Sequence, residues 1–210
     1  MIKEIEEYIK PIQKANNHRF LSWQHCYEAF GKFDYNKDKD ILSLHLAFYL
    51  ASWGMYRGSS GLLWKDYRIH YPTIDILCKY QELRNNYNLE KINNLYNELK
   101  SYYDNIEYNN GKKSQIKNVS PTTTLISKIM LGTLGCSPAF DRYFLKGIGI
   151  NTNSFPILIE NVKKIIDSDE KIAEIEECQV LIKQKLNFDY PSMKIIDMFY
   201  WQKGYTTLNI

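Results

Sequence analysis

The residue types best suited to chemistry lie between Lys128 and Arg142. Lys128 falls at helical spacing beside Leu125 and Leu131, and Asp141 follows thirteen residues later. A lysine on an apolar helix needs an acid, a cavity or a route to solvent for its ammonium group. A neighbouring carboxylate could stabilise a cation or position a water molecule. We therefore take Asp141 and Lys128 as candidate catalytic residues that face a pocket.

Asp141 also suits a structural role. It follows a Gly-Cys-Ser-Pro turn and precedes the apolar run of the next expected helix. An acidic side chain at that position stabilises the N-terminus of a helix. The sequence leaves both interpretations of Asp141 open.

Glycine and arginine residues are concentrated in two windows. Of the ten glycines, three lie within 54–61 and four within 132–149. The same windows hold Arg57 and Arg142 among apolar and aromatic neighbours, where a guanidinium group needs a partner. Together with the adjacent Trp53 and Tyr143, these arginines are candidate substrate-binding residues. Tight helix packing is the alternative explanation for the glycines.

The last expected helix carries a third group of candidates. Lys194, Asp197 and Trp201 share one of its sides. Lys194 and Trp201 could line a pocket in which aromatic rings stack on a base, as they do for unpaired nucleotides. The alternative is ordinary packing with an internal Lys194–Asp197 pair.

The charge is unevenly distributed along the chain. The net charge of +3 is too small to indicate nucleic-acid binding by itself. Residues 105–150, in the centre of the chain, are nevertheless mainly basic, while residues 155–182 are mainly acidic. Lys112, Lys113 and Lys117 are the candidate nucleic-acid contacts of this basic centre.

Composition and cysteine spacing exclude several classes of protein. With 44% hydrophobic and 24% charged residues, the chain is of ordinary globular type. Its four cysteines form no CxxC pair and its four histidines have no ligand spacing, so we expect reduced thiols, no metal and no cofactor. No apolar run suggests a signal peptide or a membrane span. We expect a cytoplasmic protein without a membrane partner.

Nearly every segment has helical periodicity and none alternates convincingly as a strand. The sequence therefore predicts one all-α domain over 1–210, a compact multi-helix bundle. Residues 122–134 are apolar around most of the helix circumference, which predicts a buried central helix. Residues 105–120 are expected to form a mobile loop. Pro121 is expected to start this central helix. The other expected elements are helices over 2–10, 19–30 (ending at Gly31) and 41–56, a short helix closed by Pro72, a helical pair over 73–103, and a last helix over 192–202.

The segment TTTLISKIMLGTLGCSPAFDRYF resembles the core of the helix-hairpin-helix DNA glycosylases. It shares their layout of an apolar helix, a Gly/Pro turn and an aspartate that opens the next helix. The resemblance covers about 25 of the 210 residues. It implies DNA as a partner and a role for Asp141 in cleavage of the N-glycosidic bond. The family's catalytic lysine lies further upstream than Lys128, so the resemblance gives Lys128 no Schiff-base role.

Two functions follow as expectations. The first is a DNA-binding, DNA-glycosylase-like protein with Asp141 as the catalytic carboxylate. The second is a non-catalytic helical module of a bacterial defence or regulatory system that binds a protein partner or forms a homodimer. The segments SWGMYRGSSGLL, KIMLGTLGCSPAFDRYF and PSMKIIDMFYWQ also resemble a family of uncharacterised bacterial proteins, and that resemblance implies no activity.

Overall fold

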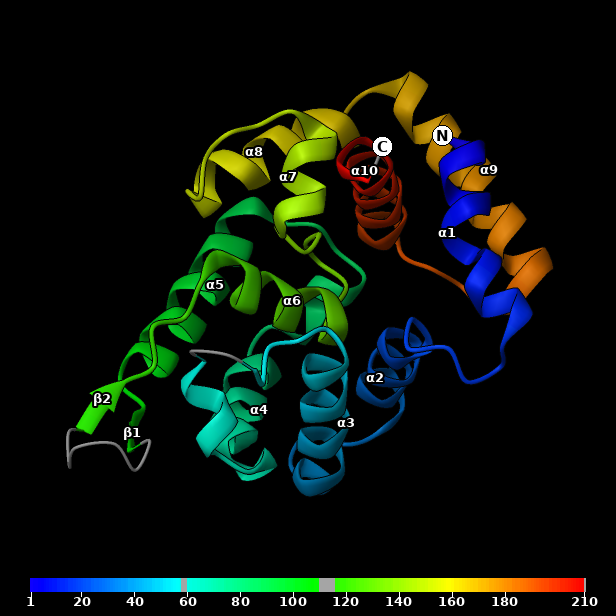
Figure 1. Ribbon diagram of the computed structural model, residues 1–210. Helices are drawn as coiled ribbons and strands as arrows, with labels where there is room; N and C mark the ends of the chain where they lie inside the picture. Colours follow the sequence, from blue (N-terminus) through cyan, green and yellow to red (C-terminus); the bar gives the residue numbers. More distant parts are fainter. Residues whose placement is uncertain (58–59, 110–115, 210) are drawn as a thin grey trace.

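The computed structural model describes residues 1–57, 60–109 and 116–209. These residues form an all-α bundle, as the periodicity predicts (Figure 1). No helix among them is long and apolar enough to cross a membrane. The α-helices are α1 (Ile2–Lys14), α2 (Leu21–Lys32), α3 (Lys39–Ser52), α4 (Tyr71–Cys78), α5 (Leu89–Asp104), α6 (Thr123–Thr133), α7 (Arg142–Ile148), α8 (Phe155–Ile166), α9 (Asp169–Leu186) and α10 (Ser192–Leu208).

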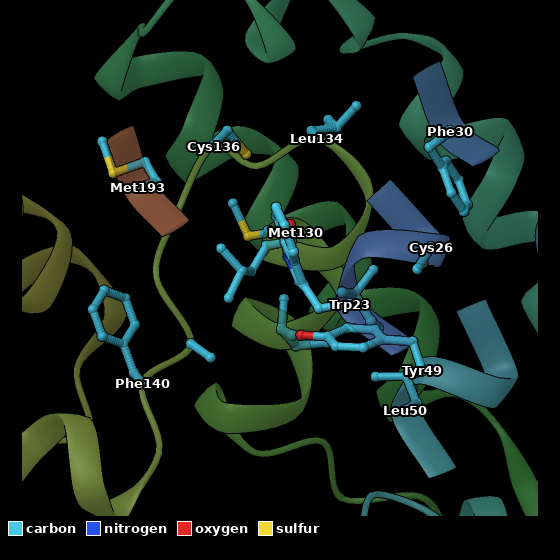
Figure 2. Packing of buried hydrophobic residues seen from close by; sticks show 14 of the residues in the cluster. Trp23, Cys26, Phe30, Tyr49, Leu50, Met130, Leu134, Cys136, Phe140 and Met193 are labelled. Atoms are coloured by element: carbon cyan, nitrogen blue, oxygen red, sulfur yellow. The ribbon is translucent and has the colours of Figure 1, made fainter. Parts of the chain in front are cut away.

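Helix α6 is the buried central helix that the sequence predicts. All its residues from Leu125 to Thr133 are buried, and α2, α3 and α5 pack around it. The side chains of Trp23, Tyr49 and Met130 meet in this core (Figure 2). The indole N–H of Trp23 donates a hydrogen bond of 3.0 Å to the carbonyl oxygen of Leu131. The helix is therefore tied to α2 by a polar contact as well as by packing.

Arg84 closes the C-terminal end of α6, a role that the sequence did not reveal. It lies in the short 3-10 helix η3 (Gln81–Arg84), and its guanidinium donates to the carbonyl oxygens of Thr133 (2.7 Å) and Tyr27 (2.8 Å). A cation at the C-terminal end of a helix is stabilising, because it is attracted to the negative end of the helix dipole. The prediction that α2 ends at Gly31 is wrong, because Gly31 lies within the helix. A Cβ atom there would lie 2.6 Å from the Arg84 guanidinium.

Two prolines act differently from the prediction. Pro72 lies in the first turn of α4 instead of closing the preceding short helix, because the first turn has no need of its N–H. Pro121 precedes α6 instead of opening it, because the Thr122 side chain caps this helix at the amide of Leu125. Two more 3-10 helices precede α4, η1 (Gly61–Trp64) and η2 (Tyr67–His70).

The expected loop over 105–120 contains a short antiparallel hairpin, so the prediction of no strand is wrong here. Its strands are β1 (Glu107–Asn109) and β2 (Ile116–Asn118). Tyr108 and Val119 pack against the backbone of Gly61, where a Cβ atom would lie 2.6 Å from Val119 and 2.8 Å from Tyr108. This tertiary contact holds residues whose composition alone favours a loop.

Helices α7 and α10 cross at very close range because glycines lie at the crossing. A Cβ atom on Gly204 would lie 1.9 Å from the carbonyl oxygen of Tyr143, and one on Gly147 would lie 1.9 Å from that of Tyr200. Helix α10 also runs to Leu208, beyond the expected end at 202. The crossing fixes α7, and with it the aspartate at its N-terminus, against α10.

A buried hydrogen-bonded chain joins η2 and α4 to α5. The ring of His70 is fully buried and contacts the hydroxyl groups of Tyr56 and Tyr103, each at 2.6 Å. The Tyr103 hydroxyl also lies 2.8 Å from that of Thr73. Burial lowers the pKa of His70 from 6.5 to about 3, so the folded chain holds this histidine neutral.

This burial predicts that stability falls as the pH falls from about 6.5 towards 3. In that range the unfolded chain binds a proton at His70 and the folded chain does not, so the unfolding free energy drops by about 1.4 kcal/mol per pH unit. Between pH 7 and pH 5 this amounts to about 2 kcal/mol. Urea unfolding of wild type and His70→Gln at both pH values measures it. An equal pH dependence in the two proteins would refute the assignment.

Candidate functional site

Asp141 is the N-cap of α7, so its structural interpretation is confirmed. One carboxylate oxygen, Oδ1, accepts hydrogen bonds from the backbone N–H groups of Tyr143 (3.0 Å) and Phe144 (3.1 Å). The other, Oδ2, lies 3.2 Å from the ammonium group of Lys128 on α6. The Lys128 side chain is 4% exposed, whereas that of Asp141 is 15% exposed. The carboxylate is thus held by three donors and still reaches the surface.

A second lysine–aspartate pair lies within α10, as the alternative interpretation of this helix predicts. The ammonium group of Lys194 lies 2.7 Å from Oδ2 of Asp197, and both side chains are buried. The Lys194 ammonium also donates to the hydroxyl of Tyr8, at 3.3 Å. The structure therefore places Lys194 inside the core.

The indole ring of Trp53 joins the two pairs. It lies just beyond α3, with the ammonium nitrogen of Lys128 at 4.7 Å and that of Lys194 at 5.9 Å from its centroid. The exposed guanidinium of Arg19 lies at 5.2 Å from the same ring. An aromatic face attracts cations at these distances, most strongly where water is excluded. Of the predicted residues, the structure thus brings Lys128, Trp53 and Lys194 together.

A chain of aromatic rings leads from Trp53 to the surface. Trp201 on α10 packs edge-on against Trp53, with 6.3 Å between the ring centroids, and against Tyr143 at 5.1 Å. Tyr205 stacks on Trp201 at 5.0 Å and is 41% exposed. The exposed Arg142 donates to the Tyr143 hydroxyl at 2.6 Å. This aromatic chain brings the predicted Trp201, Tyr143 and Arg142 to one end of the site.

Other predicted residues lie elsewhere. Arg57 was expected among apolar neighbours and is instead exposed beside a hollow of about 420 Å³, which Tyr108, Thr122 and Leu125 also line. The Arg57 guanidinium therefore needs no buried partner, because water solvates it. Lys117 is exposed on β2. Lys112 and Lys113 lie outside the described residues.

Burial determines the ionisation of two further groups. Burial, followed by the charges of Asp197 and Asp141, raises the pKa of Tyr8 well above its ordinary value. The phenol therefore keeps its proton at neutral pH. Burial likewise raises the pKa of the Cys136 thiol to about 12, which leaves almost no thiolate to act as a nucleophile.

Sequence reasoning missed the part of the site that comes from the N-terminal helices. Tyr8 on α1 and Trp23 on α2 lie 5.1 and 5.2 Å from the Lys194 ammonium, although they are more than 170 residues away in the chain. No local pattern indicates so distant a contact. Tyr205, in contrast, follows Trp201 at helical spacing, and the early end predicted for the last helix excluded it.

The described residues contain no group of histidine, cysteine and acidic side chains that could hold a metal ion. Comparisons with protein-family models, with curated proteins and with solved structures find no match to this chain.

Proposed function

We propose that this protein binds DNA and hydrolyses the bond between a base and its deoxyribose, with Asp141 as the acting carboxylate. The observation that carries the proposal is the setting of this carboxylate. It is held by two backbone N–H groups and the ammonium group of Lys128, which faces the Trp53 ring, and its side chain remains 15% exposed. The resemblance of this segment to the helix-hairpin-helix glycosylase core supports the same function.

In the proposed reaction the C1′–N bond of the nucleotide breaks and the base leaves with the electron pair. A carboxylate beside C1′ stabilises the positive charge that develops on the sugar. The oxygen of a water molecule then bonds to C1′, one water proton passes to the carboxylate, and the departing base is protonated from solvent. Return of the carboxylate proton to solvent leaves an abasic site and a free base.

Lys128 has a positioning role in this proposal. Its ammonium group is bound to Asp141 and faces the Trp53 ring, and its side chain is 4% exposed. An ammonium group in this setting orients the carboxylate and balances its charge. To attack a sugar carbon, the Lys128 amine would first have to leave the Asp141 carboxylate and the Trp53 ring.

The aromatic chain supplies the contacts for a base. Tyr205 and the half-buried Tyr143 present rings on which an unpaired base can stack, at about 1–3 kcal/mol per base, and the buried Trp201 packs against both of them. Arg142, at the edge of this chain, is exposed and can contact a phosphate. The base acted on must leave the duplex stack to reach a carboxylate inside the protein.

The test begins with DNA affinity as a function of salt concentration. We expect fluorescence anisotropy to show binding at about 50 mM salt that weakens log-linearly as the salt rises. Arg142→Gln should weaken binding. It should also lower the slope of log affinity against log salt concentration by about one, because the variant makes one phosphate contact fewer and releases one counterion fewer. Lys203→Gln, which removes an exposed positive charge from α10, is the matched control. Absence of any affinity at low salt would rule the proposal out.

A second candidate function rests on the outer face of α3. Ile41, Leu44 and Phe48 recur there at three- and four-residue steps and are 39%, 46% and 59% exposed. Exposed apolar side chains that share one helix face form a patch of the kind that marks protein-interaction sites. A homodimer or a captured partner that is lost in Phe48→Asp, in a protein without DNA affinity, would favour the interaction module.

A further inference from the structure

The six residues before Asp141 form an irregular segment that is nevertheless buried. Residues 135–140 have no helix or strand, and every one of them is buried. Irregular backbone inside a protein must satisfy its N–H and C=O groups with partners from elsewhere, because it forms no ladder of its own. The partners of this segment therefore decide where the segment lies and where Asp141 begins α7.

Three side chains supply those partners at the last two residues of the segment. The carboxylate Oδ1 of Asp197 accepts the N–H of Ala139 at 3.0 Å. The hydroxyl of Ser127 accepts the N–H of Phe140 at 2.9 Å, and the hydroxyl of Thr124 donates to the carbonyl oxygen of Phe140 at 2.8 Å. Two of these groups come from α6 and one from α10, so the segment is held from both sides.

Asp197 differs from the other two partners because it is charged and buried. Its second oxygen binds Lys194, which is buried against Tyr8 and Trp23. A buried ion pair contributes little net stability compared with well-packed apolar residues, because both ions lose their hydration. Stability alone therefore gives no reason for the pair. What an apolar pair could not supply is the acceptor for the Ala139 N–H.

We propose that Asp197 is a positioning residue for Asp141. Asp197 holds Ala139, two residues before Asp141, and Lys194 holds Asp197 in the orientation that this bond requires. The orientation of the Asp141 carboxylate thus depends on a charged pair on α10, as well as on Lys128 and the α7 amides. This inference rests on the proposed function of Asp141, and it also makes a structural claim that can be measured without any activity.

Two double variants test the proposal: Lys194→Met/Asp197→Asn and Lys194→Met/Asp197→Leu. Both remove the two buried charges, and only the asparagine retains an oxygen for the Ala139 N–H. We expect kcat for base release to fall about 100-fold further in the leucine variant, with KM changed little, because a displacement of about 1 Å costs that much. If the wild type releases base, equal kcat values in the two folded variants would overturn the proposal.

Amide hydrogen exchange in the same two variants gives the readout that needs no substrate. The N–H groups of Tyr143 and Phe144 report on Asp141, because they donate to its Oδ1. We expect them to exchange at least about tenfold faster in the leucine variant, a loss of about 1.4 kcal/mol of protection. If exchange differs while wild type releases no base, the positioning claim stands and the proposed function fails. Equal exchange overturns the positioning claim, whatever the activity.

Discussion

Gly204→Ala is expected to destabilise the protein by at least about 3 kcal/mol, which lowers Tm by roughly 6–12 °C in a chain of this length. The added Cβ atom would lie 1.9 Å from the carbonyl oxygen of Tyr143 and 2.8 Å from the amide nitrogen of Gly147. These are backbone atoms of a packed helix, which cannot turn aside as a flexible side chain can. Helix α7 must therefore move away from α10. Calorimetry of the two proteins measures the effect.

Gly149→Ala is the matched control for this prediction. Gly149 is the C-cap of α7, with φ +77°, and a Cβ atom there would meet nothing within 4 Å. Its substitution costs only the strain of the left-handed backbone, about 1–2 kcal/mol. If Gly204→Ala were no more destabilising than Gly149→Ala, the close crossing of α7 and α10 would be wrong.

Asp141→Asn is expected to reduce base release about 100- to 1000-fold while DNA affinity stays within a few-fold of wild type. Asparagine caps a helix as well as aspartate does, so α7 should keep its start. The substitution removes the negative charge that would face the sugar. It also leaves the buried Lys128 without its counter-charge, which we expect to cost about 3 kcal/mol of stability. Single-turnover base release at saturating protein measures the chemical effect.

Two further variants separate chemistry from folding in this prediction. Lys128→Met/Asp141→Asn removes both charges, so it should regain stability and still lack base release. Lys128→Met alone keeps the carboxylate, and we expect it to lose only about tenfold in rate, as befits a positioning residue. A fully active Lys128→Met/Asp141→Asn variant would show that Asp141 only caps α7.

The helical fold and the local parts of the site could be predicted from the sequence. Apolar residues around most of the circumference of 122–134 indicate a helix inside a bundle, and α6 is buried from Leu125 to Thr133. The Lys194–Asp197 pair is one helical turn apart, so spacing alone brings its charges together. The position of Asp141 after a Gly/Pro turn likewise predicts a helix N-cap.

The long-range parts could not be predicted, because they depend on packing between distant segments. The contact of Tyr8 with Lys194 spans 186 residues, and the capping of α6 by Arg84 spans 49. Helix ends were misplaced for the same reason. Gly31 reads as a helix stop by its propensity, but it packs against the guanidinium of Arg84 and the helix ends at the next residue, Lys32. Tertiary contacts override local preference at such positions.

The measurement that tests the central claim most directly is the detection of free base by mass spectrometry. Wild-type protein is incubated with short duplexes that each carry one damaged or mismatched base. The amounts of free base and of abasic sites are then measured in the same samples. The proposed function predicts that both products accumulate in equal amounts from at least one duplex, and that neither does so with Asp141→Asn. If the protein binds these duplexes but releases no base from any of them, the proposed function is contradicted.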